Sequence, residues 1–342
     1  MFVFEFKYKM KIRITLICSF LILLSTIACD AQTKTMLNQE KGKNPLLCNT
    51  DSGTCEIADS NTQQIEIVPK QTNKSIHILY FTDPICSACW GIEAQLRKLK
   101  LEYGDYFSIE YRMGGLLKDW SYNNGGISKP SDVSHHWDEV SQYYQMPIDG
   151  DIWLEDPLPS SYPPSIAFKA AQLQDEDKAL LFLRRIREMV FLEKKNICNW
   201  TYLSLAAKEV GLDAIKLKKD SENIANELFQ NDLKITAESG VRGFPTLIFS
   251  NQSKDFQYIN GFKPYIAFEN IILRLNPNAI KQKYNKDWKS LFTHISSLTL
   301  KEFCELSEVN TNQGLEILNQ LNKDGKLQVF QTKNGNIWRM KK

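Results

Sequence analysis

The feature that most constrains this chain is a pair of cysteines separated by two residues, Cys86-Ser-Ala-Cys89. Residues 75–82 before it are rich in β-branched and aromatic side chains and predict a buried strand, which the Asp83-Pro84 turn signal ends. Residues 90–100 after it carry apolar side chains at helical spacing. Cys86 is therefore predicted at a helix N-terminus, where unpaired N–H groups and the helix dipole lower the pKa of a thiol.

This placement predicts thiol–disulfide exchange, with Cys86 as the attacking sulfur and Cys89 as the resolving thiol. The same cysteine spacing also forms half of many zinc sites, and zinc would need two further ligands. The four histidines are scattered along the chain, and the sequence has no second C-x-x-C. We therefore expect a redox pair, with no metal site and no cofactor.

A second motif lies far downstream at residues 241–246, Val-Arg-Gly-Phe-Pro-Thr, directly before an apolar run. A proline entering a central strand is normally excluded unless it starts the strand or sits in a turn, often as the cis isomer. In the thioredoxin fold such a proline faces the C-x-x-C pair and leaves the preceding backbone free to pair with an extended substrate. We therefore predict a cis-proline at Pro245, with Phe244 and Pro245 as substrate-binding residues.

Together the two motifs resemble the DsbA-like (FrnE-type) branch of the thioredoxin superfamily. Residues 96–104, 166–174 and 191–197 are similar to one subfamily of that branch, the adaptors of the Clp protease. The resemblance implies a thioredoxin-like α/β fold with a helical insertion, a redox-active centre at the C-x-x-C pair, and protein thiols or disulfides as substrates. The dipeptide Ser87-Ala88 replaces the Pro-His of strongly oxidising members, so the histidine that would stabilise the thiolate is missing.

At 342 residues and 43% hydrophobic content, the chain is long enough for two domains. We predict a DsbA-like domain over residues 75–276, with the helical insertion at about 114–240. Residues 285–342 are expected to form two helices and an Asn-Gly hairpin, which resemble a winged helix. The candidate recognition helix, 310–322, contains no Lys or Arg, although phosphate contacts supply much of the affinity of DNA binders. We therefore expect no nucleic-acid partner, and a packing or protein-interaction role for this domain.

Residues 1–29 predict a signal peptide, because a basic segment near Met10 precedes an apolar run that ends at Cys29. The stretch 25–29, Ser-Thr-Ile-Ala-Cys, resembles a bacterial lipobox, in which Cys29 would be acylated and would anchor the protein to a membrane. We expect an exported lipoprotein facing the periplasm. The alternative function, a cytoplasmic protein-binding adaptor that delivers a client to the Clp protease, conflicts with this signal. The sequence leaves the oligomeric state open.

Residues 30–74 are polar and are expected to form a tether. Within it, Cys48 and Cys55 bracket an Asp-Ser-Gly turn signal and are expected to form a disulfide. The flanking sequence offers no core for the bridge to brace. Two roles therefore remain open, a redox relay that exchanges with the active-site pair and an inert bridge across a turn. Cys198 and Cys304 have no obvious partners and are expected to be buried apolar side chains.

Overall fold

The structure is a computed structural model that describes residues 46, 48–57, 74–121 and 129–341. The predicted signal peptide, the lipidation site at Cys29 and most of the expected tether lie outside the described residues. None of the helices among those that are described combines the length and the apolar character needed to cross a membrane.

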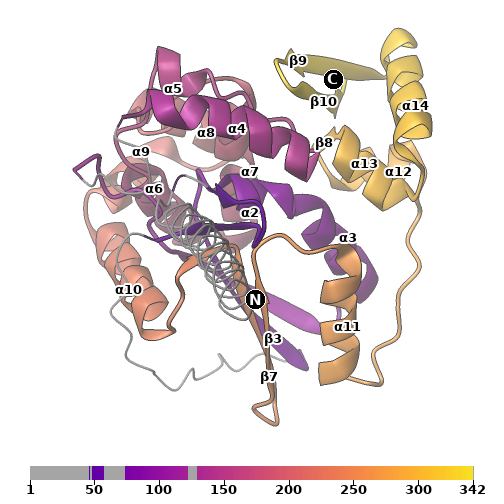
Figure 1. Cartoon of the computed structure of the whole chain (residues 1–342), viewed down its shortest axis with the longest axis horizontal. Coiled ribbons are helices and arrows are strands. Elements are labelled where there is room, and N and C mark those ends of the chain that lie inside the picture. Colours follow the sequence, from indigo (N-terminus) through magenta and orange to yellow (C-terminus); the bar gives the residue numbers. More distant parts are fainter. Residues whose placement is uncertain (1–45, 47, 58–73, 122–128, 342) are drawn as a thin grey trace, which may run out of the picture. The chain divides into compact units, whose positions relative to one another are not determined.

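A four-stranded sheet in the order β4-β3-β6-β7 forms the centre of the thioredoxin-like part (Figure 1). Its strands are β3 (Ile76–Thr82), β4 (Phe107–Met113), β6 (Thr246–Asn251) and β7 (Phe256–Asn260). The central strand β3 runs parallel to β4 and antiparallel to β6. Every residue of β3 is buried, and successive side chains enter two different hydrophobic clusters, Ile78 and Tyr80 on one face and Leu79 and Phe81 on the other. Both faces of the strand are therefore covered, as its continuous run of apolar residues predicts.

Helices connect and cover these strands. The active-site helix α2 (Ser87–Gly91) and the longer α3 (Glu93–Tyr103) lead from β3 to β4, and α11 (Tyr265–Leu275) packs beside α3. Between β4 and the short strand β5 (Gly243–Phe244), all the regular elements that the structure describes are helices, which confirms the predicted insertion. They are α4 (Ser131–Tyr144), α5 (Ile152–Glu155), α6 (Tyr162–Gln172), α7 (Glu176–Leu192), α8 (Trp200–Glu209), α9 (Ala214–Ser221) and α10 (Ile224–Glu238).

Residues 48–57 differ from the tether expected over 30–74. They form a hairpin of β1 (Cys48–Asn49) and β2 (Thr54–Glu56), and β2 pairs antiparallel with β5 in a separate three-stranded sheet. The side chains of Cys48 and Cys55 are buried in the main hydrophobic cluster. The expectation that this segment has no core to brace is therefore wrong, because backbone pairing with β5 brings it onto the globular part.

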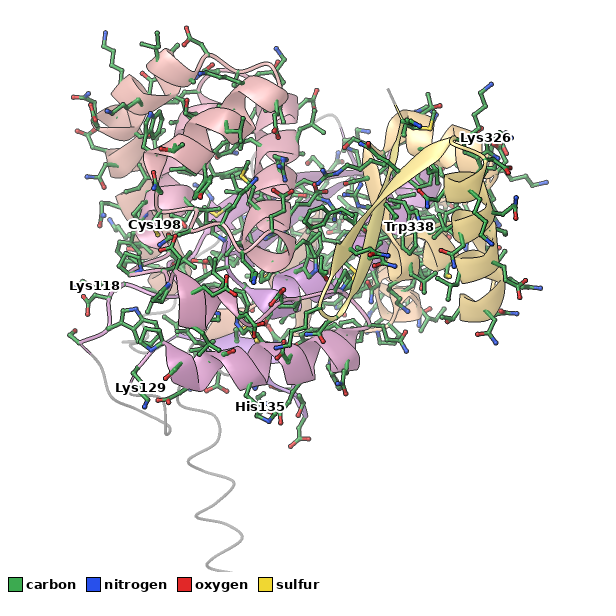
Figure 2. The ribbon with its side chains drawn as sticks, turned by 90° about the horizontal axis from the view of Figure 1, so that it is seen from above. Lys118, Lys129, His135, Cys198, Lys326 and Trp338 are labelled. Carbon is green, nitrogen blue, oxygen red and sulfur yellow. A yellow bond between two sulfur atoms is a disulfide. The ribbon has the colours of Figure 1, made fainter. Side chains whose placement is uncertain are left out.

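The C-terminal part contains the two helices and the hairpin predicted from the sequence. Its elements are α12 (Trp288–His294), β8 (Ser297–Thr299), α13 (Leu300–Ser307), α14 (Thr311–Lys323), β9 (Leu327–Thr332) and β10 (Gly335–Met340). The strands form a sheet in the order β8-β10-β9, and Trp338 is buried between this sheet and the helices (Figure 2). The likeness to a winged helix stays a prediction.

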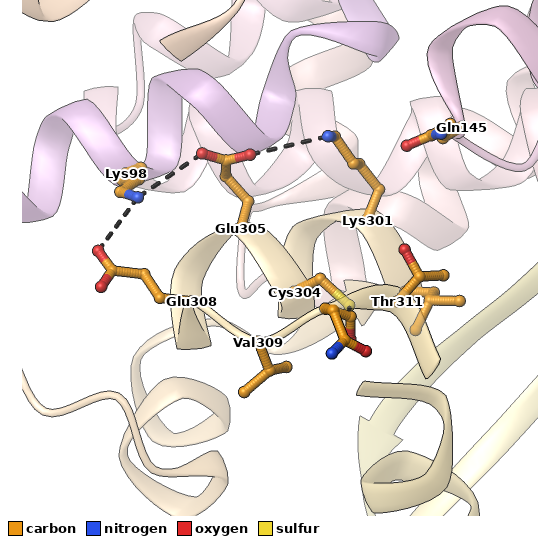
Figure 3. A pocket seen from close by; sticks show the side chains of 10 residues that line it. Lys98, Gln145, Lys301, Cys304, Glu305, Glu308, Val309 and Thr311 are labelled. Atoms are coloured by element: carbon orange, nitrogen blue, oxygen red, sulfur yellow. Dashed lines mark hydrogen bonds and ion pairs between the residues drawn. The ribbon is translucent and has the colours of Figure 1, made fainter. Parts of the chain in front are cut away.

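Helix α13 packs against α3, which follows the active-site helix. A pocket opens at this contact, and its rim carries ion pairs from Lys98 to Glu305 and Glu308 at 3.7 and 3.2 Å (Figure 3). Cys304 also lines the pocket, far along the chain from the C-x-x-C pair. A buried ion pair between Arg184 of α7 and Glu302 of α13 joins the helical insertion to the C-terminal part.

Candidate active site

Cys86 is the N-cap residue of α2, and its sulfur accepts a hydrogen bond of 3.1 Å from the backbone N–H of Cys89. The cap arises because β3 ends at the Asp83-Pro84 step, so the chain enters the helix with Cys86 in an extended conformation. Both cysteines are free thiols, and neither side chain is exposed to solvent. The structure therefore places Cys86 at the helix N-terminus predicted from the sequence.

The Cys48–Cys55 hairpin lies between the second motif, Phe244 and Pro245, and the active-site residue Cys86. The Phe244–Pro245 peptide bond is cis. The backbone of Phe244 pairs with Cys55, whose sulfur lies 3.7 Å from the sulfur of Cys86. Phe244 also belongs to the same hydrophobic cluster as Cys48, Cys55, Cys86 and Cys89. Residues about 160 positions apart in the sequence are thus brought together around one short hairpin.

Cys48 and Cys55 are joined by a disulfide. The sulfur of Cys48 lies 2.9 Å from the hydroxyl of Ser87. A bridged sulfur carries no proton, so the Ser87 hydroxyl is the donor of this hydrogen bond. The first residue of the dipeptide between the two active-site cysteines therefore contacts the hairpin directly.

Burial controls the protonation of the active-site thiols. Burial raises the pKa of Cys86 well above its usual range, although the hydrogen bond from Cys89 N–H and the charge of Arg187 oppose the shift. The backbone hydrogen bond at the helix N-terminus acts in the expected direction, but burial outweighs it, so the expectation of a lowered pKa is wrong. For Cys89, burial acts in the same sense, but the hydrogen bond from Cys86 and the charge of Arg187 outweigh it and lower the pKa.

Arg187 is a site residue that the sequence analysis missed. Its guanidinium is buried beneath the cysteines and donates hydrogen bonds to Thr82 Oγ1 at 2.7 Å and to Glu93 Oε1 at 2.6 Å. A signal was present, because Arg187 is four residues after Leu183 and three before Val190, on the apolar face of α7. A charged residue on such a face predicts a buried ion pair or a site.

Asp83 is a second missed residue. Its carboxylate accepts hydrogen bonds from Ile85 N, Leu116 N and Ser161 Oγ at 2.7 to 3.0 Å. Burial raises its pKa to about 6, against the effect of these bonds and of Arg187. The residue therefore ties the loop before Cys86 to the start of the helical insertion.

The remaining cysteines have hydrogen-bond partners other than the C-x-x-C pair. Cys198 in the helical insertion (Figure 2) donates a hydrogen bond of 2.8 Å to the carbonyl of Ser160, and Cys304 lies within 3.7 Å of the carbonyl of Asn310. Both are partly exposed rather than fully buried. In the described part of the chain, no three His, Cys, Asp or Glu side chains are grouped closely enough to hold a metal ion.

Comparisons with known proteins agree with this fold. A family model described as thioredoxin (Thioredoxin_5) matches residues 79–270. The ClpXP adapter protein SpxH of Halalkalibacterium halodurans is 32% identical over 308 residues, which cover 87% of this chain and 98% of the relative. SpxH of Bacillus subtilis is 28% identical over 271 residues, covering 78% of this chain and 89% of the relative.

Among solved structures, a proposed protein disulfide isomerase from Nitrosomonas europaea superposes with a TM-score of 0.50 at 19% identity. The alignment covers 59% of this chain and 96% of that protein, and at this identity it shows the fold alone. The family match and the 32% identical relative go further. The chain belongs to the thioredoxin family that the matching family model describes and to the family of the SpxH adapters.

Proposed function

We propose that this protein exchanges disulfides with protein substrates through Cys86 and Cys89. The observation that carries the proposal is the free Cys86 sulfur at the N-cap of α2, hydrogen-bonded by Cys89 N–H, with Arg187 beneath the pair. In the exchange, the Cys86 thiolate attacks a substrate disulfide, forms a mixed disulfide and releases one substrate thiolate. Cys89 then attacks the Cys86 sulfur, which releases the second substrate thiolate and leaves the pair oxidised.

The edge of β5 is the proposed seat for an extended substrate. The backbones of Gly243 and Phe244 pair with β2 beside the cysteines, so a substrate strand would take the place of β2, and Pro245 directly precedes β6 without a donor of its own. A substrate strand that pairs there gains backbone hydrogen bonds that do not depend on its sequence. This mode of binding suits an exchange partner for many different proteins.

A redox titration tests the proposal. The protein is equilibrated in glutathione buffers of graded ratio, quenched with acid and alkylated, and Cys86 and Cys89 are followed by mass spectrometry. We expect both thiols to disappear together in a two-electron transition, and the protein to catalyse insulin reduction by dithiothreitol. Cys198→Ser is the matched control and should behave as wild type, since the sulfur of Cys198 bonds to the carbonyl of Ser160 and not to the C-x-x-C pair. A pair that stays reduced in every buffer, with no insulin reduction, would contradict the proposal.

A protein-binding adaptor is the second candidate function, because the relatives at 32% and 28% identity are named ClpXP adapters. An adaptor for that protease has to reach the cytoplasm, whereas the sequence of residues 1–29 favours export and a lipid anchor at Cys29. Compartment therefore separates the two functions. We expect the mature chain in the membrane fraction, and Cys29→Ala to release it. An unprocessed chain found in the cytosol would instead favour the adaptor.

A further inference from the structure

We propose that the Cys48–Cys55 disulfide is a built-in substrate of the Cys86–Cys89 pair, seated on the strand edge that external substrates would use. This inference rests on the proposed thiol–disulfide exchange and adds its immediate partner. It also gives the N-terminal hairpin a role in controlling access to Cys86. The sequence leaves two roles open for this bridge, a redox relay and an inert brace. An exchange with Cys86–Cys89 makes the bridge a relay.

The hairpin occupies the edge of β5 by backbone pairing. Cys55 pairs with Phe244 and Glu56 with Gly243, and Ile57 N–H donates to the carbonyl of Arg242 at 2.7 Å. The lack of a side chain at Gly243 permits this approach, because a Cβ there would lie 2.8 Å from the carbonyl oxygen of Cys55. The hairpin thus adds a strand to β5 in the way an extended peptide substrate would.

The tip of the hairpin is held from the opposite side. Gly53 has a φ of +67°, and its carbonyl accepts a hydrogen bond of 2.8 Å from the backbone N–H of Phe262. A Cβ on Gly53 would lie 2.6 Å from that nitrogen, so only glycine fits both the conformation and the contact. Contacts on both sides fix the position of the disulfide between them.

The sulfur atoms are arranged for exchange. Cys86 Sγ lies 3.7 Å from Cys55 Sγ, which is van der Waals contact and slightly longer than the roughly 3–3.5 Å that separates reacting atoms just before attack. Cys48 is then the leaving sulfur, and it already accepts the hydrogen bond from Ser87 Oγ. A developing thiolate on Cys48 would strengthen this bond, because hydrogen bonds to charged acceptors are stronger than those to neutral ones.

The exchange balances without an external reagent. The fraction of Cys86 that has lost its proton, which is small because burial raises the pKa of this thiol, attacks Cys55, the Cys48–Cys55 bond breaks, and Cys48 leaves as a thiolate. The Cys89 thiolate then attacks Cys86 and displaces Cys55. The active-site pair has lost two electrons and two protons, and the hairpin has gained them as two thiols. The reverse sequence oxidises the hairpin and reduces the pair.

The bound hairpin also closes the site. Cys86 is fully buried, and that burial raises the pKa of its thiol. An external substrate must therefore displace the hairpin from β5 before its own disulfide can approach Cys86. Displacement of the hairpin exposes the Cys86 thiol and reduces the burial that raises its pKa. The same movement therefore frees the edge of β5 for a substrate and favours the thiolate.

The test uses full-length Cys89→Ser protein with the Cys48–Cys55 bridge oxidised, incubated with iodoacetamide. Opening of the bridge by Cys86 exposes the Cys48 thiol, which alkylation traps irreversibly. We expect a Cys55–Cys86 disulfide and alkylated Cys48 to accumulate together, as read by mass spectrometry of unreduced peptides. The matched control, Cys86→Ser with Cys89→Ser, should keep the hairpin bridge intact. Adding Ser87→Ala should slow the alkylation of Cys48 about tenfold. A tenfold change in rate corresponds to roughly 1.4 kcal/mol, which is within the range for the loss of one hydrogen bond.

Two outcomes would overturn the inference. One is alkylation of Cys86 while Cys48–Cys55 stays bridged, and the other is opening of the bridge at the same rate in the control that lacks Cys86. Insulin reduction by wild-type protein separates this failure from failure of the proposed function. Retained insulin reduction with an unopened bridge refutes the built-in substrate alone, whereas loss of both refutes the exchange function as well.

Discussion

The Cys86→Ser variant is expected to reduce insulin no faster than a reaction without protein. A serine hydroxyl remains protonated at any pH at which the protein is folded, and its oxygen cannot replace sulfur in a mixed disulfide. The helix N-terminus and Arg187 then have no thiolate to stabilise. The measurement is the initial rate of insulin precipitation with dithiothreitol, at equal protein concentration for each variant.

Two companion variants make the result specific. Cys89→Ser keeps the attacking sulfur, so it should form mixed disulfides with insulin but turn over slowly, because nothing resolves them. Cys198→Ser removes a thiol outside the site and should keep the wild-type rate. Undiminished activity in Cys86→Ser would show that the C-x-x-C pair is not the reaction centre.

Much of the fold around this centre is predictable from local patterns. The apolar run at 75–82 and the helical spacing after Cys89 are such patterns, because burial on a strand or helix face follows a short period. The structure confirms the first as β3 and the second as α3, which the short helix α2 precedes. Proline at the start of a strand was equally informative, since few strand positions tolerate it.

The hairpin on β5 was beyond the reach of such patterns. Its pairing joins backbone groups of Cys55 and Phe244, and backbone hydrogen bonds leave no characteristic side chains in the sequence. The polar composition of residues 30–74 indicates little burial, and two buried sulfurs are too few to change that average. The role of Asp83 could not be predicted for a similar reason. Its three hydrogen-bond partners lie in loops and at a helix start, and no periodic pattern in the sequence predicts the positions of such residues.

The contact between the insertion and the C-terminal part rests on a buried ion network that was also unpredicted. Arg184 Nη1 and Nη2 donate to the two carboxylate oxygens of Glu302 at 2.8 and 2.9 Å, and Arg97 Nε lies 2.9 Å from the same carboxylate. Glu302 is 0% exposed and also accepts from the backbone N–H of Thr299, which closes a capping box at the start of α13. The Arg184 guanidinium stacks 4.3 Å from the ring of Trp90, the residue after Cys89. The network therefore reaches from α13 to the active-site helix.

Glu302→Ala is expected to lower the free energy of unfolding by about 3–5 kcal/mol at pH 7, the usual cost of removing one partner of a buried ion pair. Arg184 would keep its ion pair with Glu188 at 2.8 Å but lose its bidentate partner, Arg97 would lose the same carboxylate, and α13 would lose half of its capping box. Urea unfolding followed by circular dichroism measures the change. Glu316→Ala is the matched control, because Glu316 is an exposed glutamate on α14, and it should change stability by less than about 0.5 kcal/mol.

The effect of Glu302→Ala should also depend on pH in a defined direction. Burial alone would raise the pKa of Glu302, but Arg184 and Arg97 outweigh it and lower the pKa below the ordinary value. A depressed pKa in the folded state adds stability above the unfolded pKa of about 4.3, and that stability is lost as the pH falls through the folded pKa. The difference between wild type and variant should therefore be largest near neutral pH and shrink below about pH 4. A difference under about 1 kcal/mol at pH 7, the range of exposed ion pairs, would show that the network does not hold the C-terminal part to the active-site helix.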